Sequence, residues 1–409
     1  MVISHLLNRT LIIPPIRFAK NALSYFEFDT LQRILAISAP EAEDCDLLDE
    51  SDQWACHKYR EHSNVGWSWL VDLQSAVRNL NLTVVERWDM SVDWFRNVLH
   101  LNLDASDSFF LRDTSLYEFA FVDADPPAES YKKYINTIAL EDLDDLTSSR
   151  RLVHLGSVFG TTRLILRKPE SRRARRIARE SMVLANPHLQ SSAERIRKQL
   201  GEGYIGVHLR IGDGLFSAAA PENARNIWWK VVCGIMELDP QEALRMERLI
   251  PGAIDGSEPR LPDDLSDIIT STIPKPANSA KPLHLPTLAI LPNSSSLHCR
   301  APLHPPPFDI LNTPIFLSTD APSPNTHPLI QRFLLSFPCV FFLSDFETPF
   351  HIVNGDDGKD MNHYLMGFLD AMVASLGARV VGTKNSTFSA YIQDVLWRKY
   401  HGWPITSRG

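Results

Sequence analysis

The chain has 409 residues, of which 44% are hydrophobic and 22% are charged, and its formal net charge at pH 7 is −8. This length predicts two domains of mixed type. The negative charge argues against general nucleic-acid binding, which requires a basic surface. No apolar run is long enough to span a membrane, and residues 1–10 lack the basic start, apolar stretch and cleavage site of a signal peptide.

The first 200 residues combine short strands with helices. Residues 1–8 have the pattern of the end of a helix, and residues 10–14 (TLIIP) that of a strand stopped by proline. Because a domain rarely opens on half a helix, we expect a further strand and loop ahead of them. The other predicted elements are a strand near 82–88, a helix near 92–101, a strand at 119–122, an apolar segment at 152–166, and helices at 169–185 and 187–200.

From Gly203 onward, short hydrophobic strands alternate with helices, a pattern typical of a parallel α/β sheet. Prolines crowd residues 251–314, so we expect a partly disordered insertion there, without a continuous helix or central strand. These patterns predict an N-terminal domain over 1–200 and a C-terminal domain over 201–409. Within the latter, the predicted strands lie at 204–209, 315–318, 340–343 and 379–382, and the predicted helices at 228–238, 326–335 and 360–376.

The five cysteines show no zinc-binding spacing, so we expect no structural metal. Cys45 and Cys56 flank a short acidic loop and would bridge in an oxidising compartment, whereas in the cytosol they would stay reduced. The residues alone leave that choice open. Triplets for N-glycosylation, which carry meaning only in a secretory setting, begin at Asn8, Asn81, Asn293 and Asn385.

Two charged segments allow more than one interpretation. Residues 163–179 carry eight Lys or Arg residues and a single acidic one. Such a pattern is typical of a solvated helix face, and a surface for an anionic ligand or an acidic partner is the alternative. Asp123-Ala124-Asp125 resembles the DxD motif of metal–nucleotide sites, but two prolines follow it directly in an acidic stretch, which favours an ordinary loop.

The most informative stretch is GYIGVHLRIGDG at residues 203–214. Its apolar residues predict a buried strand, which delivers His208, Arg210 and Asp213 at or just beyond its carboxyl end. Ligands of open α/β sheets bind outside the carboxyl ends of strands, and the planar fork of an arginine matches pairs of phosphate oxygens. The alternative is an arginine that only pairs with a neighbour, and we expect Asp213 to brace Arg210.

A second strand end, IFLSTD, places Ser318, Thr319 and Asp320 where a buried strand finishes. An aspartate at this position can accept N–H donors from a purine base or bond a ribose hydroxyl. It can equally serve as the N-cap of the helix predicted at 326–335. Both interpretations stand on the sequence alone.

A third strand end, GTKNSTFSAYI, passes from a strand into a helix that begins near Ser386. Exposed N–H groups and the helix dipole make such a helix start a ready anion site. The hydroxyls of Ser386, Thr387 and Ser389 would add bonds to phosphate, and Phe388 would offer an aromatic face to a nucleobase. An ordinary capped helix is the alternative. The sequence lacks the GxxxxGK[ST], GxGxxG and GxSxG motifs of three other common site types.

Taken in order, HLRIGDG, STD and GTKNSTFSAYI resemble the GDP-fucose protein O-fucosyltransferase family. LLNRTLIIPP and LVHLGSVFGTTRL also resemble it, particularly its fungal members, so the similarity covers most of the chain outside the proline-rich insertion. The resemblance implies a GT-B architecture, in which two Rossmann-like domains face each other across a cleft and the C-terminal one holds most of the donor nucleotide. It also implies inverting, metal-independent transfer of fucose from GDP-fucose to a Ser or Thr hydroxyl.

The same resemblance implies a role for each residue of the three motifs. Arg210 would bind the β-phosphate and stabilise the charge that develops on the departing GDP. His208 would contact the nucleotide beside it, Asp320 would hold the guanine or its ribose, Ser386 and Thr387 would bind phosphate, and Phe388 would line the nucleotide pocket. The implied partners are a nucleotide sugar and a protein or glycan acceptor, with no cofactor besides the GDP-fucose donor.

The chain departs from the family pattern at its start. Family members carry a glycine- and asparagine-bearing loop that closes over the donor, and here Met1 falls after that loop. No residue can be assigned as the general base that an inverting transfer requires. The alternative function is therefore a catalytically impaired GT-B module that binds a nucleotide or a protein. The family works in the endoplasmic reticulum and Golgi lumen, which this chain would reach only with an upstream signal.

Overall fold

The computed structural model describes residues 1–18, 25–37, 44–124, 133–156, 163–212, 214–250, 259–272, 286–347, 351–355 and 357–406. The chain is a mixed α/β protein with several parallel sheets. It divides into two compact units. The N-terminal unit consists of Met1–Ala185 and Ile352–Tyr364, and the C-terminal unit consists of Asn186–His351 and Leu365–Thr406.

The C-terminal unit is built on a parallel four-stranded sheet in the order β12-β11-β10-β13. Its strands are β10 (Ile205–Leu209), β11 (Ile315–Thr319), β12 (Val340–Phe341) and β13 (Arg379–Gly382). All four lie within the strands predicted from the apolar runs, apart from one added residue at the end of β11. Central parallel strands are covered on both faces, which is why β10 is buried along its whole length.

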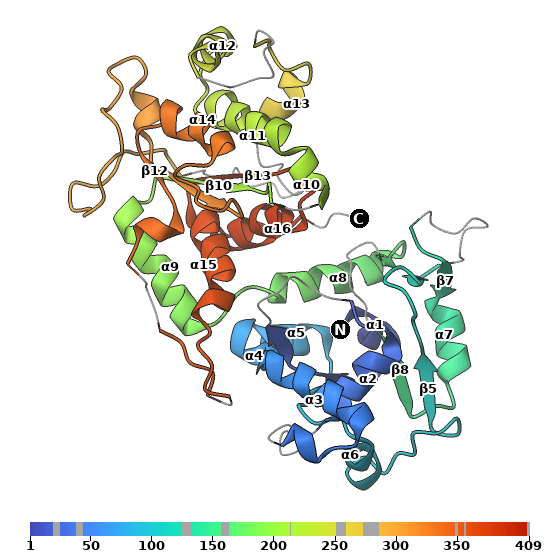
Figure 1. The fold of residues 1–409 in the computed structure, drawn as a ribbon. Coiled ribbons are helices and arrows are strands. Elements are labelled where there is room, and N and C mark those ends of the chain that lie inside the picture. Colours follow the sequence, from blue (N-terminus) through green and yellow to red (C-terminus); the bar gives the residue numbers. More distant parts are fainter. Residues whose placement is uncertain are drawn as a thin grey trace. The chain divides into compact units, whose positions relative to one another are not determined.

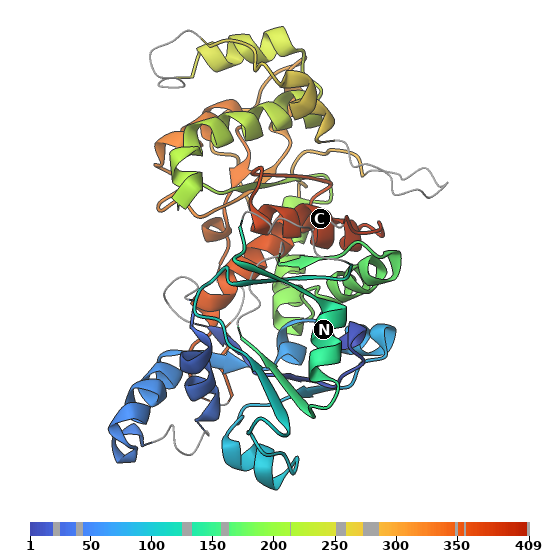
Figure 2. The same cartoon turned by 90° about the vertical axis from the view of Figure 1, so that its right-hand side faces the viewer.

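Helices cover both faces of this sheet (Figures 1 and 2). α11 (Ala220–Trp229) and α14 (Pro328–Ser336) lie on one face, and α9 (Pro187–Leu200), α15 (Asn362–Leu376) and α16 (Thr387–Ala390) lie on the other. The helix predicted at 228–238 starts earlier, and α11 continues as a π-helical turn over Lys230–Ile235. The connection from β10 to β11 also contains α10 (Gly214–Ala218) and α12 (Pro240–Arg248).

One glycine determines how closely α15 approaches the sheet. A Cβ atom added to Gly206 in β10 would lie 1.9 Å from the carbonyl oxygen of Ala374 in α15. No side chain fits at that distance, so the glycine permits direct backbone contact between strand and helix. This contact places α15 against the face of the sheet that also carries His208.

A buried carboxylate joins three elements on the other face. Glu247 of α12 is fully buried, and its two oxygens accept hydrogen bonds from Nε and Nη2 of Arg225, both at 2.9 Å. It also pairs with Arg332 of α14 and accepts a hydrogen bond from Trp229 Nε1 at 3.2 Å. Because a buried charge is tolerated only when it is paired, this cluster fixes α11, α12 and α14 relative to one another.

The proline-rich segment contains one short helix in its described part, α13 (Leu265–Thr270), and a 3₁₀ turn at Asp309–Asn312. This agrees with the prediction that it forms no continuous helix or central strand. Residues 251–258 and 273–285 lie outside the described residues, so the predicted partial disorder stays a prediction. Arg379 donates a hydrogen bond to the Pro286 carbonyl at 2.7 Å, and the Ala289 N–H donates to Gly203. Residues 286–289 therefore lie at the amino-terminal edge of the sheet.

The N-terminal unit carries its strands in separate small sheets. β1 (Leu11–Ile13) pairs in parallel with β4 (Val84–Glu86), and β5 (Ser108–Leu111) pairs in parallel with β8 (Leu152–Leu155). β6 (Phe119–Val122) lies between β7 (Asn136–Ala139) and β9 (Leu164–Ile165), and β2 (Ile16–Phe18) pairs antiparallel with β3 (Ser63–Val65). The strands predicted at 10–14, 82–88 and 119–122 are confirmed.

The helices of this unit include the expected short helix at its start, α1 (Val2–Leu6). It packs with α5 (Leu73–Leu80) and α8 (Pro169–Ser181). The helix predicted at 92–101 ends early, because α6 covers only Val92–Asn97. The other helices are α2 (Phe28–Ala36), α3 (Glu50–Glu61), α4 (Trp67–Leu70) and α7 (Leu140–Thr147).

Disulfides join Cys45 to Cys56 and Cys299 to Cys339, while Cys233 is free and buried. The first is the pair expected for an oxidising compartment, and the second links the proline-rich segment to the residue that precedes β12. In the part of the chain that the structure describes, no helix combines the length and the apolar character needed to cross a membrane.

Candidate functional site

The carboxyl ends of β10 and β13 form the topological switch point of the C-terminal sheet. From β10 the chain moves to β11 and β12 on one side, and it returns to β13 on the other side of β10. The connections that leave β10 and β13 therefore diverge, and ligands of such sheets bind in the crevice that this divergence opens. HLRIG and GTKNSTFS are the two segments that leave these strands.

His208 is a buried member of this strand end, with 3% of its surface exposed. Its Nδ1 atom lies 2.6 Å from the hydroxyl of Ser389, and its ring makes an edge contact with Phe388 at 5.1 Å between centroids. Burial lowers the pKa of His208 to about 4, although the Asp320 carboxylate opposes this shift. The imidazole is therefore neutral at neutral pH and has one N–H donor and one acceptor nitrogen.

Arg210 lies at the end of β10 with 32% of its side chain exposed. Its Nε atom lies 3.1 Å from Oδ2 of Asp320, and its backbone N–H donates to the Thr383 hydroxyl at 2.9 Å. The ion pair fixes the plane of the guanidinium, and the backbone bond ties this residue to the end of β13. Arg210 is thus a positioned cation at the switch point.

Asp320 supports the loop that carries Arg210. Its two carboxylate oxygens accept hydrogen bonds from the backbone N–H groups of Ile211, at 2.8 Å, and Gly212, at 3.0 Å. The helix-cap interpretation of Asp320 is wrong, because His327 caps α14. Asp213 was predicted to brace Arg210, and it lies outside the described residues. Among the described residues, Asp320 braces Arg210.

The start of the helix after β13 has the geometry predicted for it. Ser386 is the N-cap, and its hydroxyl accepts a hydrogen bond from the Ser389 N–H at 3.2 Å. Asn385 adopts a left-handed conformation with φ 64°, which turns the chain from the strand into the helix. Helical structure then continues from α16 through a π-helical stretch (Tyr391–Trp397) and α17 (Arg398–Tyr400).

The hydroxyls of the STFS segment have different surroundings. Thr387 is exposed and Phe388 is half-buried. Ser386 is 4% exposed and Ser389 is fully buried against His208. Among these residues, Thr387 and the free amides at the helix start are therefore placed to meet a ligand, whereas Ser389 acts as the partner of His208.

Thr383 and Asp370, to which no role was assigned from the sequence, complete this region. Thr383 accepts the Arg210 N–H, and its own N–H donates to the His208 carbonyl at 3.1 Å, so it joins the two strand ends. Ser318, opposite His208 in the strand register, donates to Asp370 of α15 at 2.5 Å. Burial raises the pKa of Asp370 to about 7, against the effect of this hydrogen bond. A polar residue directly after a strand was the available signal for Thr383.

The other candidates from the sequence have structural roles. Both oxygens of Asp123 accept backbone hydrogen bonds at the start of α8, from Arg167 and Lys168, at 2.6 and 3.0 Å. Burial would raise the pKa of Asp123, but hydrogen bonds to these amides and to Ser171 lower it overall. Asp125 lies outside the described residues.

The basic segment 163–179 is partly buried and partly exposed. Arg163 is buried, while Arg172, Arg173 and Arg176 form an exposed basic face on α8.

The described residues contain no group of three or more His, Cys, Asp or Glu side chains arranged to hold a metal ion. The expectation of a metal-independent site therefore stays a prediction. Comparison of the chain with models of known protein families and with curated proteins finds no match.

Proposed function

We propose that the switch point of the C-terminal sheet binds the diphosphate of a nucleotide sugar. The observation that carries this proposal is the convergence of a positioned cation, Arg210, with a capped helix start at Ser386. Both features favour anions, the first by charge and the second by its dipole and N–H groups. They leave adjacent strands joined by the Thr383 hydrogen bonds.

We further propose that the chain is a GT-B glycosyltransferase that moves fucose from GDP-fucose to a Ser or Thr hydroxyl, with inversion and without a metal. The architecture, the sugar and the acceptor rest on the sequence resemblance. The chemistry is compatible with the site: cleavage of the sugar–phosphate bond leaves a diphosphate anion, and a fixed guanidinium stabilises that charge as it develops.

In this proposal two of the remaining residues contact the nucleotide, and two others position the residues that do. Phe388 lies beside His208 and offers an aromatic face to the base, and the exposed Thr387 hydroxyl adds a phosphate contact. Asp320 acts through Arg210 and the 211–212 amides rather than through the base. Ser389 orients His208.

The second candidate function is a GT-B module that binds the nucleotide without transferring the sugar. The observation that favours it concerns the general base. Asp320 is the carboxylate that the described hydrogen bonds place at this edge, and it already accepts two amides and pairs with Arg210. It therefore does not serve as the acceptor of a proton from an incoming hydroxyl.

The disulfides bear on the compartment. Cys45–Cys56 and Cys299–Cys339 support an oxidising environment such as the lumen of the endoplasmic reticulum or Golgi, because such bonds rarely persist in the cytosol.

Calorimetric titration of the protein with GDP and GDP-fucose tests the nucleotide site. Arg210→Ala should weaken binding about 100-fold, since two charge-assisted hydrogen bonds to phosphate are worth about 3 kcal/mol. Arg197→Ala is the matched control, because Arg197 is similarly exposed, at 28%, and is also ion-paired, but to Glu194 of α9. This control should bind GDP as the unchanged protein does.

Absence of GDP binding by the folded, unchanged protein would refute the nucleotide site, and equal loss in both variants would refute the role of Arg210. Release of GDP from GDP-fucose with a peptide or glycan acceptor then separates the enzyme from the binding module. Binding without turnover would favour the module.

A further inference from the structure

The proline-rich segment reaches the outer edge of β12, the last described strand on one side of the C-terminal sheet. Among the described strands, β12 pairs with β11 alone. The Ile315 N–H of β11 donates to the Cys339 carbonyl at 2.9 Å, so the backbone of Cys339 faces β11. Successive residues of a strand direct their backbone groups to opposite sides, so those of Pro338 and Val340 face outward. Such an edge is a template for a further strand.

Arg300 covers this edge together with Asp345. The Arg300 backbone N–H donates to the Pro338 carbonyl at 2.7 Å, and its Nε atom donates to the Val340 carbonyl at 2.8 Å. Its guanidinium pairs with Asp345, whose Oδ2 atom accepts the Phe342 N–H at 2.8 Å. The guanidinium also lies 5.3 Å from the centre of the Phe342 ring. Two outward carbonyls and one outward N–H of the strand are therefore satisfied by these two side chains and one backbone amide.

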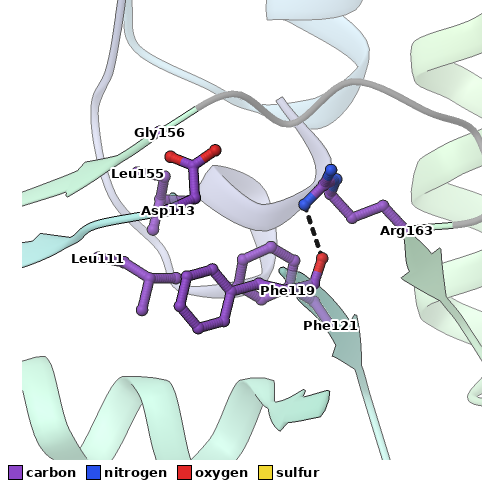
Figure 3. Close-up of a pocket in the computed structure, with 7 residues that line it drawn as sticks. All are labelled: Leu111, Asp113, Phe119, Phe121, Leu155, Gly156 and Arg163. Atoms are coloured by element: carbon purple, nitrogen blue, oxygen red, sulfur yellow. Dashed lines mark hydrogen bonds between the residues drawn. The ribbon is translucent and has the colours of Figure 1, made fainter. Parts of the chain in front are cut away.

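An arginine on a strand carbonyl does not by itself cover an edge, as the N-terminal unit shows. There Nη1 of Arg163 donates to the Phe119 carbonyl at 2.7 Å, across a small pocket from Asp113 (Figure 3). Phe119 belongs to β6, which lies between β7 and β9. Because β6 has a neighbour on each side, Arg163 is a matched comparison for Arg300 that covers no outer strand.

Two clamps hold Arg300 against β12. On one side, the adjacent Cys299 forms a disulfide with Cys339, which is 1% exposed and directly precedes the strand. On the other side, the Asn312 side chain accepts the His304 N–H at 2.8 Å and donates to the His304 carbonyl at 2.9 Å. The disulfide closes a loop of 40 positions and the Asn312 clamp one of 8. Since a longer loop costs more entropy to close, the disulfide contributes more to keeping Arg300 in place.

The outward groups of this edge are complementary to themselves. In an antiparallel pair centred on Val340, the Val340 N–H of each copy donates to the Val340 carbonyl of the other. The Phe342 N–H of each copy then donates to the Pro338 carbonyl of the other. One two-fold axis satisfies both copies at once, as symmetric dimers require. Because backbone groups carry no sequence preference, the strand of matching length and pattern that fits this edge is β12 of a second copy.

From this geometry we infer that the Cys299–Cys339 disulfide is a redox latch on the edge of β12. While the disulfide is intact, Arg300 and Asp345 cover the edge. When it is reduced, Arg300 leaves, and β12 pairs with β12 of a second copy of this chain. The inference does not rest on the nucleotide site, since none of these residues takes part in that site.

A dithiol supplies the electrons for opening the latch. One thiolate of the reductant attacks a sulfur of the disulfide, the S–S bond breaks, and a mixed disulfide forms. The second thiol of the reductant then closes on the first. The reductant leaves as an internal disulfide, and its two protons end on the thiols of Cys299 and Cys339.

Sedimentation velocity and hydrogen exchange of the full chain test the latch. In the Cys45→Ser/Cys56→Ser variant, dithiothreitol opens only the Cys299–Cys339 bond of the two disulfides. Reduction should make the Arg300 amide exchange about tenfold faster, because a loop of 40 positions is no longer closed. It should also produce a concentration-dependent dimer. The Cys299→Ser/Cys339→Ser variant should form the same dimer without reductant, whereas the unreduced Cys45→Ser/Cys56→Ser control should not.

The same samples locate the contact. As the dimer forms, the Val340 amide should exchange more slowly, while the Ile315 amide inside the sheet should stay unchanged. Adding Arg300→Ala to the reduced protein should shift dimer formation to lower concentration, because the competing cover is weaker. Arg163→Ala should cause no such shift.

Four results would overturn the latch. The first is an Arg300 amide that stays protected after reduction, and the second is a reduced protein that remains monomeric while this amide exchanges freely. The third is equal association of the unreduced Cys45→Ser/Cys56→Ser control, which would trace dimer formation to general destabilisation. The fourth is a dimer without slower exchange at Val340, since its contact would lie elsewhere.

Discussion

Asp320→Asn distinguishes a brace for the Arg210 loop from a contact to the nucleobase. In the structure its two oxygens accept the Ile211 and Gly212 amides at 2.8 and 3.0 Å, and Oδ2 also pairs with Arg210 at 3.1 Å. An asparagine keeps one acceptor and places an NH₂ group against the other amide. A hydrogen bond to a charged acceptor is worth about 1.5–3 kcal/mol, and this partly exposed ion pair adds at most about 1 kcal/mol. We therefore expect a loss of about 2 kcal/mol in the free energy of unfolding without any ligand.

Urea denaturation of the ligand-free protein measures this loss, and calorimetry of the same variant measures GDP affinity. A brace predicts both a lower urea midpoint and roughly tenfold weaker binding of GDP and ADP alike, because the guanidinium loses its fixed plane. A contact to guanine or ribose predicts unchanged stability. An unchanged urea midpoint together with a selective loss of GDP over ADP binding would refute the brace and restore the base-contact interpretation.

Three further predictions concern the fold that supports the site. Glu247→Gln should lower the free energy of unfolding by about 3–5 kcal/mol, because it leaves Arg225 and Arg332 beside a neutral amide. The control Glu242→Gln, at a partly exposed ion pair on α12, should cost less than about 1 kcal/mol, and denaturant melts of both variants check this. Gly206→Ala should destabilise the protein severely, because the added Cβ atom would lie 1.9 Å from the Ala374 carbonyl oxygen. Gly367→Ala, on α15 with open space around it, should instead raise the free energy of unfolding by about 0.5–1 kcal/mol, and denaturant melts of both variants check this. The pKa of His208 falls from 6.5 to about 4 on folding, so the unfolded chain binds a proton first as the pH falls, and the folded state loses about 3 kcal/mol of stability between pH 6.5 and pH 4. The urea midpoint should therefore depend less on pH in His208→Gln than in the unchanged protein, and an equal pH dependence in the two proteins would contradict the lowered pKa.

The sequence predicts the C-terminal sheet well because its strands are short apolar runs bounded by glycine, proline or polar residues. The Ser386 cap was also predictable, since capping depends on residues only three positions apart. The order of the strands in the sheet cannot be predicted in this way. Nothing local places β13 beside β10, yet this pairing creates the switch point where the candidate site lies.

The roles of single polar residues were less predictable, because they depend on contacts far apart in the chain. Asp320 was considered as a base contact or a helix cap, and the structure shows it accepting amides more than 100 positions away. Ser389 was considered a phosphate ligand, and it is buried against His208. Asp370 carried no local signal, since an aspartate within an amphipathic helix is ordinary until tertiary packing buries its carboxylate.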